Sequence, residues 1–169
     1  MNTSISRWCA IALVSFASLA AQAQDFKVGV VNVVRLTNES APAKSAQQKL
    51  EQEFAKRQKE LADQQANLKS FSEKFERDAP TLSETQRSTR QREYADMGRD
   101  FQRRQREFQE DLNARRNEEL QQVMERANKA VKQVAEAEKF DLVLQEAVYV
   151  NAKYDITDKV LKILNSATK

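Results

Sequence analysis

The sequence predicts an α+β protein in which the two chain ends form a small β body and the middle forms a long antiparallel helical hairpin. Apolar residues are unevenly distributed: of the 32 Leu, Ile, Val and Phe residues after position 23, 18 lie in ranges 26–36 and 140–164. The range 43–139 holds one Gly and one Pro and is rich in strong helix formers. Large apolar residues are also mirrored about Thr81, as they would be in a hairpin.

The first 23 residues have the pattern of a signal peptide. Arg7 precedes an apolar run over 10–19, and the small-x-small sequence Ala21-Gln22-Ala23 follows it. The run is shorter than the roughly 20 apolar residues that a membrane-spanning helix needs. We therefore expect cleavage after Ala23 and export of the mature chain. Cys9 would be removed with the signal peptide, so no disulfide could stabilise the mature chain.

Two long helices are expected in the range 40–139, which we predict to be an arm. Pro80 interrupts the helical composition, because the residue before a proline is restricted away from helical backbone angles. Ser83-Glu84-Thr85-Gln86 has the spacing of a capping box, which would start a second helix, and Thr81-Leu82-Ser83-Glu84 fits the same pattern equally well. The predicted helices cover about 40–78 and 83–138, and at 1.5 Å per residue they are about 58 and 84 Å long. Neither has enough apolar residues to be stable alone, so they must pair.

The pairing of the two helices can be predicted from residue numbers. Residues that face each other across an antiparallel hairpin have numbers with a constant sum, and four large apolar pairs share the sum of 162. Apolar residues recur every seven positions in the first helix, as in a coiled-coil seam, and every eleven in the second, which favours a straighter pairing. The predicted seam therefore joins Leu50 with Leu112, Phe54 with Phe108, Leu61 with Phe101, and Leu68 with Tyr94.

The chain ends, 24–39 and 140–169, are predicted to form the body. The range 28–34 is almost wholly apolar and β-branched, which indicates a strand buried on both faces. Two further short strands are predicted within 141–150, and Thr157 is the expected N-cap of a final helix. Such a small core needs oligomerisation to hold the arms, although the residues do not fix the number of subunits. The expected oligomer-forming residues are Val28, Val30, Val31, Val33, Leu142, Leu144, Val148 and Val150.

Three stretches of the sequence are typical of a known family. They are 28–32 (VGVVN), 140–144 (FDLVL) and 154–161 (YDITDKVL). Together with the architecture, they make the mature chain resemble the Skp family of periplasmic chaperones, also called OmpH-like proteins. The resemblance implies a homotrimer with three helical hairpins around a cavity. It also implies a periplasmic location and ATP-independent holding of unfolded outer-membrane β-barrel proteins.

The distal part of the hairpin carries two phenylalanines that the mirror relation leaves without apolar partners. Phe71 would face Gln91, and Phe75 would face Arg87. One interpretation is that these rings pack locally or stay exposed, as single apolar residues often do. The other is that they bind client proteins through weak contacts, together with Tyr94.

Arginines are concentrated in the distal second helix, among them Arg87, Arg90 and Arg92. They would attract acidic barrel proteins and anionic lipid or lipopolysaccharide surfaces. The alternative is that they only solvate a helix face, because acidic residues are interleaved with them. The candidate client-binding residues are thus Phe71, Phe75, Tyr94, Arg87, Arg90 and Arg92.

The composition disfavours several other function classes. With no His and only two Gly, the chain has no imidazole base, no His-ligated metal and no Gly-rich phosphate loop. Its carboxylates are mixed with Lys and Arg at salt-bridge spacing, so we expect no enzyme activity, metal or cofactor. The net charge of +3 is small, and we expect no nucleic-acid partner. The main alternative to a chaperone is an exported coiled-coil structural or adaptor protein without a client cavity.

Overall fold

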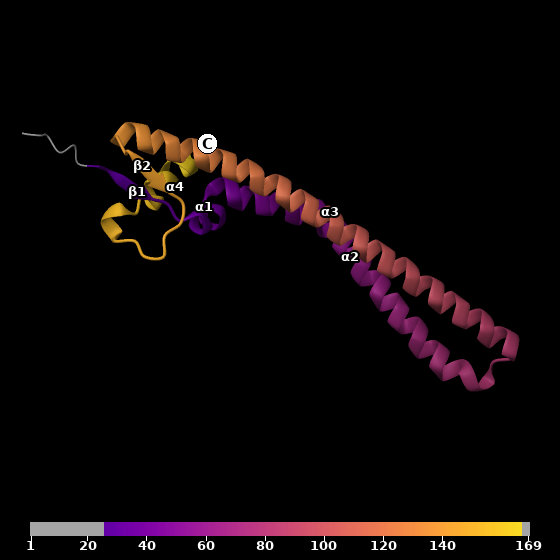
Figure 1. Cartoon of the computed structure of the whole chain (residues 1–169). Helices are drawn as coiled ribbons and strands as arrows, with labels where there is room; N and C mark the ends of the chain where they lie inside the picture. Colours follow the sequence, from indigo (N-terminus) through magenta and orange to yellow (C-terminus); the bar gives the residue numbers. More distant parts are fainter. Residues whose placement is uncertain (1–25, 167–169) are drawn as a thin grey trace, which may run out of the picture.

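The computed structural model describes residues 26–166, so the predicted signal peptide lies outside the described residues. A long two-helix hairpin dominates the molecule, and the remaining elements gather at the end opposite its turn (Figure 1). The protein is mostly helical, with a small two-stranded sheet. In chain order the elements are β1 (Val28–Val30), α1 (Val33–Glu39), α2 (Ala41–Asp78), the 3-10 helix η1 (Ala79–Thr81), α3 (Glu84–Glu138), β2 (Leu142–Leu144), the 3-10 helix η2 (Ala152–Tyr154) and α4 (Thr157–Ser166).

The two hairpin helices begin and end within one residue of their predicted ranges. The Ser40 hydroxyl starts α2 by accepting from the backbone N–H of Ala43 at 3.3 Å. Pro80 lies in η1, which makes the turn. The predicted capping box is confirmed, because the Ser83 hydroxyl accepts from the Gln86 N–H at 3.3 Å and the Gln86 side chain accepts from the Ser83 N–H at 3.0 Å. Local sequence therefore determines where the hairpin turns.

The sheet joins the two chain ends. Strands β1 and β2 are parallel, with Val28 beside Leu142 and Val30 beside Leu144. One further hydrogen bond, from the Val31 N–H to the Leu144 carbonyl at 2.9 Å, extends the pairing. Parallel neighbours require a long crossover connection, and here the entire hairpin is that connection.

The strands are shorter than the sequence predicts. β1 ends at Val30, because the Asn32 side chain accepts from the Arg35 N–H at 3.0 Å and caps α1. Val33 therefore lies in a helix, and its predicted place in a strand is wrong. The strand expected at 147–150 is also absent from the described part of the chain. β-branched composition shows only that a residue suits a sheet, and a strand forms where a neighbour is available to pair with it.

The core lies at the root of the hairpin, where α4 packs across α1 and the last turns of α3. Alanines on α3 allow the helices to approach closely, and Leu36 of α1 fills the space between them. The core contains nothing from the distal hairpin, so it fixes only the root of the arm. Its buried members are Val31, Leu36, Ala127, Ala130, Val134, Ile156, Val160, Leu161 and Leu164.

Thr157 links the two chain ends by hydrogen bonds. Its buried hydroxyl accepts from the Asn32 N–H at 2.9 Å, and its own N–H donates to the Asp155 carboxylate at 2.8 Å. The prediction that Thr157 caps α4 is wrong, because it is the first helical residue and its hydroxyl serves the other chain end. Hydrogen bonding from the Thr157 side chain and backbone lowers the pKa of Asp155 below its ordinary value.

The two glycines allow a matched stability test. A Cβ added at Gly98 would meet nothing within 4 Å, whereas a Cβ at Gly29 would lie 3.0 Å from Ile156 Cδ1 and 3.3 Å from the Phe140 ring. We expect Gly98→Ala to raise the free energy of unfolding by about 0.5–1 kcal/mol through its helix propensity, and Gly29→Ala to lower it. Urea unfolding followed by circular dichroism measures both. A less stable Gly98→Ala protein would contradict the open surroundings of Gly98.

Asp155 gives a prediction for the dependence of stability on pH. Because its pKa is lower in the folded than in the unfolded chain, its contribution to stability is present above its ordinary pKa of 3.8 and is lost as the pH falls through the folded value. We expect Asp155→Asn to be less stable than the wild type at pH 7, with the difference shrinking on acidification. Thermal unfolding of both proteins across a range of pH measures this difference. A difference that does not change with pH would show that the charge of Asp155 does not contribute to stability.

Candidate functional site

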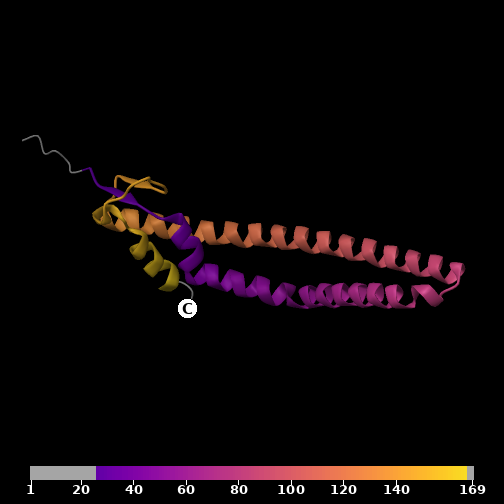
Figure 2. The same cartoon turned by 90° about the horizontal axis from the view of Figure 1, so that it is seen from below.

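The candidate site is the arm formed by α2 and α3, which run alongside each other from the body to the turn (Figure 2). Of the predicted seam pairs, Phe54 and Phe108 are in contact, whereas Tyr94, which was expected to pair with Leu68, stacks on Phe71. Phe54 is buried with 5% of its surface exposed. The other six seam positions, Leu50, Leu61, Leu68, Phe101, Phe108 and Leu112, are half-buried. The two helices of the arm therefore bury little of their side-chain surface against each other.

One contact between the helices is a cluster that we call the aromatic tie, formed by Phe54, Arg57, Phe108 and Asp111. The Phe54 and Phe108 rings meet edge to face with their centroids 5.6 Å apart, the pair that the mirror relation predicts. The Arg57 guanidinium lies 5.7 and 5.8 Å from the two ring centroids and pairs with Asp111 at 2.7 Å. Aromatic and cation–π contacts of this kind stabilise the pairing of the two helices.

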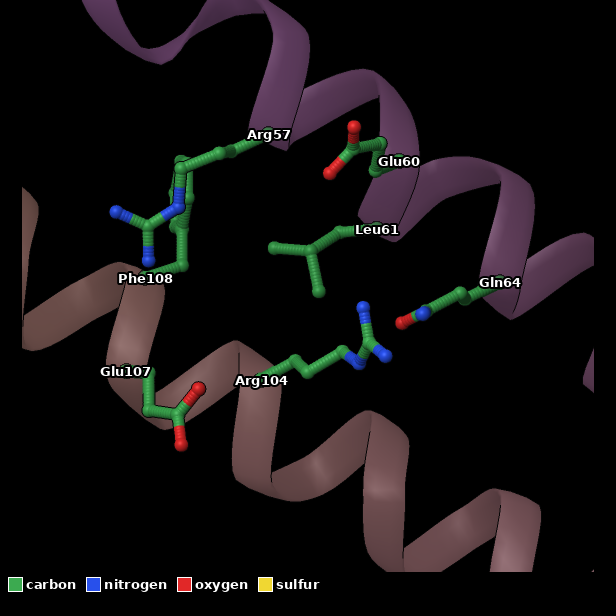
Figure 3. Close-up of a pocket in the computed structure, with 7 residues that line it drawn as sticks. All are labelled: Arg57, Glu60, Leu61, Gln64, Arg104, Glu107 and Phe108. Atoms are coloured by element: carbon green, nitrogen blue, oxygen red, sulfur yellow. The ribbon is translucent and has the colours of Figure 1, made fainter.

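On the distal side of the aromatic tie, a cavity of about 120 Å³ lies between the two helices. The Leu61 side chain points into this space, and Arg104 extends across it toward Gln64 (Figure 3). Leu61 and Phe108 are the apolar residues among those that line it. The lining residues are Arg57, Glu60, Leu61, Gln64, Arg104, Glu107 and Phe108.

The tip of the arm is held by a stack that the sequence did not predict. Phe71 lies against Tyr94 with ring centroids 6.2 Å apart and an interplanar angle of 19°, and the Arg90 guanidinium is 5.6 Å from the Phe71 ring. The expectation that Phe71 lacks an apolar partner in the hairpin is therefore wrong. Large rings on a helix reach the neighbouring turn, which shifts this pairing by three residues from the mirror position. Phe75 is half-buried.

The three predicted client-binding arginines have different surroundings. Arg87 belongs to the turn, where its Nη2 donates to the Ala79 carbonyl at 2.9 Å. Its buried Nε has no hydrogen-bond partner among residues 26–166. Arg90 pairs with Glu93 at 3.2 Å, whereas Arg92 is exposed. Further along α3, Arg99 pairs with Asp96, and Arg103 pairs with both Asp100 and Glu107.

An apolar groove lies between α2 and α3 on the body side of the aromatic tie, and no sequence pattern singled it out. This root groove has a volume of about 520 Å³. Leu120, which is exposed over 46% of its surface, lines its α3 side. The spacing of Ala43, Ala46, Leu50 and Phe54 contains a signal for it, since these residues share one face of α2. The lining residues are Thr37, Asn38, Ala43, Ala46, Gln47, Leu50, Glu51, Phe54, Gln58, Phe108, Leu112, Arg116, Glu119, Leu120 and Val123.

The body exposes apolar side chains that a single chain leaves uncovered. Both ends of β2, Leu142 and Leu144, are exposed, and Val148 and Tyr149 are exposed over most of their surface. Of the other residues expected to join subunits, Val28, Val30, Val33 and Val150 are half-buried. Val31 is buried in the chain's own core and is therefore not available to another subunit.

Neither a membrane span nor a metal cluster occurs in the described range 26–166. None of its helices is long and apolar enough to cross a membrane. None of its acidic residues gather into a group of three that could hold a metal ion. The chemistry of the arm within this range is that of apolar contacts, ion pairs and exposed charges.

Comparison with known proteins agrees with this architecture. The sequence profile described as outer membrane protein (OmpH-like) matches residues 27–164. A protein from Pectobacterium atrosepticum named Chaperone protein Skp is 34% identical over 164 residues, covering 94% of this chain and 98% of the relative. A protein of the same name from Yersinia enterocolitica is 28% identical over 161 residues, with coverage of 94% and 98%.

A solved structure shows the same fold. The crystal structure of an OmpH-like protein from Caulobacter crescentus superposes with a TM-score of 0.71 at 20% identity, covering 83% of this chain and 85% of that one. The resemblance indicated by three short stretches of sequence is thus confirmed over nearly the whole described chain. Its sequence and its fold together place this chain in the OmpH-like family.

Proposed function

We propose that this chain is an ATP-independent periplasmic holdase that captures unfolded outer-membrane β-barrel proteins between helical arms and prevents their aggregation. The names of the relatives, both called Chaperone protein Skp, support a chaperone. The observation that carries the proposal is the arm itself, in which no residue from 55 to 118 is buried. Its apolar groups remain within reach of another polypeptide along most of its length.

The proposed active form is a homotrimer assembled through the body. In this arrangement residues 24–39 and 140–169 form the oligomerisation region, residues 40–139 form the arm, and residues 1–23 are a signal peptide cleaved after Ala23. The exposed side chains of Leu142, Leu144, Val148 and Tyr149 support association, because apolar surface of this kind is covered at subunit interfaces.

The physical demands on a holdase match the properties of the arm. An unfolded barrel protein exposes apolar residues and unpaired strand edges, which aggregate. A holder that releases its client without ATP needs many contacts that are each weak. A side chain contributes about 1.5–3 kcal/mol only when it is fully buried, so the half-buried residues of the arm, such as Leu61 and Phe75, contribute less each.

At the tip, the rings of Phe71 and Tyr94 are stacked on each other, and a client that bound there would have to displace this stack. The exposed Arg92 is free to attract acidic clients and anionic lipid or lipopolysaccharide surfaces.

Shortening the arm tests the proposed function. A variant that joins Leu61 to Phe101 through the native turn sequence keeps the body and the aromatic tie but lacks the distal hairpin. We expect it to form the same oligomer and to suppress aggregation of a urea-unfolded outer-membrane barrel protein less well than the mature chain, as measured by light scattering after dilution. Equal protection by the shortened chain would show that the distal arm does not bind clients, and no protection by the mature chain would refute the chaperone.

Charge reversal at the tip tests whether arginines there attract clients electrostatically. Arg90→Glu with Arg92→Glu should slow capture of an acidic barrel protein and weaken the dependence of capture on salt, because screened attraction is lost. Arg87 is left unchanged because it holds the turn. Stopped-flow fluorescence at low and high salt measures the rate. Lys56→Glu, a charge reversal nearer the root, is the control, and capture rates equal to wild type would exclude steering by these arginines.

A further inference from the structure

A stretch of the arm lies between two ring contacts that join α2 to α3. The aromatic tie closes its root end, and the stack of Phe71 on Tyr94, which we call the tip stack, closes its distal end. We call this stretch the middle seam and define it as residues 58–70 of α2 and 95–107 of α3. Most of the residues that line the cavity of about 120 Å³ belong to it. The helices are thus joined at both ends of the middle seam and have a space between them within it.

The apolar side chains of the middle seam face the space between the helices more than they face solvent. Within the described chain, no large apolar side chain of this stretch is exposed. Leu61, Leu68 and Phe101 are half-buried, and the Leu61 side chain points into the cavity (Figure 3). While the helices stay together, a client can therefore reach only part of the apolar surface that this stretch contains.

Ion pairs join the two helices on the root side of the middle seam but not within it. Every ion pair that a described residue of the middle seam forms lies within a single helix. None of these pairs has to break for α2 and α3 to separate there. Among the described residues, the ion pairs that do cross from α2 to α3 are Lys49–Glu119 at 3.8 Å, Glu53–Arg115 at 3.3 Å and Arg57–Asp111 at 2.7 Å.

One side-chain pair forms a hydrogen bond across the middle seam among the described residues. With the Gln64 amide oriented so that its oxygen faces α3, this oxygen accepts from Arg104 Nη1 at 3.2 Å. The same guanidinium donates from Nε to Asp100 of its own helix at 2.8 Å. When the helices separate, Arg104 keeps Asp100 and water replaces it at Gln64, so the net loss is small.

Gly98 weakens α3 within the middle seam. A glycine inside a helix makes that helix less stable than an alanine would, and a Cβ at Gly98 would meet nothing within 4 Å, so no neighbour requires a glycine here. By the mirror relation Gly98 lies opposite Gln64. The part of α3 that has no cross-helix ion pair thus also contains its weakest helical residue.

We propose that α2 and α3 part along the middle seam while the aromatic tie and the tip stack stay closed, and that Leu61, Leu68 and Phe101, uncovered in this way, bind the unfolded barrel protein. Segments with few buried apolar contacts open at a lower free energy than the whole fold. A client that binds only the open form shifts the population toward it. This inference rests on the proposed chaperone function and names the apolar residues of the arm that bind the client.

Crosslinking the two helices tests whether opening is needed for client binding. The chain has no cysteine after position 23, so a short bismaleimide can join two introduced cysteines. Gln64→Cys with Arg104→Cys spans the middle seam, and Glu53→Cys with Arg115→Cys spans the root side of the aromatic tie. The control for each pair is the same protein with both thiols capped by N-ethylmaleimide.

The probe is a fluorescently labelled, urea-unfolded outer-membrane barrel protein diluted into the mature chain. We expect the crosslink in the middle seam to raise its apparent Kd roughly ten-fold over the capped control, the loss that about one side chain of apolar burial would cause. The crosslink on the root side should leave the Kd unchanged. Equal affinities of the crosslinked and capped middle-seam proteins would overturn the proposal.

Spin labels measure the opening directly. Labelled cysteines replace Ala62 and Gln102 in the middle seam, or Gln52 and Asn113 on the root side of the aromatic tie, and all four positions are exposed. By double electron–electron resonance we expect the unfolded barrel protein to shift the middle pair toward longer distances and to leave the root pair unchanged. Gly98→Ala should reduce the long-distance population. A middle pair that does not respond to the client, or a root pair that lengthens equally, would refute the opening.

The two proposals fail in different ways. If the crosslinked middle-seam protein binds the client as tightly as its capped control and the mature chain prevents aggregation, the middle seam does not open to bind clients but the chaperone function stands. If the mature chain does not prevent aggregation, the proposed function fails and the role of the middle seam in client binding fails with it.

Discussion

The scarcity of apolar side chains in the hairpin constrains the rest of the structure. No residue between 55 and 118 is buried, so these two long helices are held together at intervals by the aromatic tie, the tip stack and the capped turn. Most of the apolar burial is at the root, where α4 covers α3. The root thus stabilises the fold, and the arm keeps its side chains accessible. A better-packed arm would be more stable but would expose less apolar surface to an unfolded polypeptide.

The hairpin could be predicted because its determinants are local. Helix-forming composition, Pro80 and the capping box of Ser83 fix the helices to within one residue. The mirror relation also gives the Phe54 and Phe108 pair. It fails for Phe71, since a constant sum describes opposed backbone positions and a large ring can reach the next turn. The packing of the aromatic side chains at the tip therefore could not be predicted without the structure.

The body was harder to predict, because its structure depends on contacts between distant segments. The range 28–34 reads as one strand, but the Asn32 side chain starts a helix after three strand residues. Thr157 looks like a helix cap, whereas its hydroxyl binds the backbone of Asn32 on the other chain end. The root groove escaped notice for a similar reason. Its alanines and leucines are unremarkable in sequence, and they line a groove only because α4 ends before covering them.

The parallel pairing of β1 with β2 has a consequence for biosynthesis. The hydrogen bond between the Lys27 N–H and Asp141 connects residues 114 positions apart, so β1 is synthesised long before its partner strand β2. Until residues 142–144 have been made, β1 lacks its partner strand, and the helical hairpin can form before the sheet does. Late closure over such a distance slows folding. A newly made copy of this protein is therefore itself incompletely folded for a time, with the same need for protection that we propose it supplies to others.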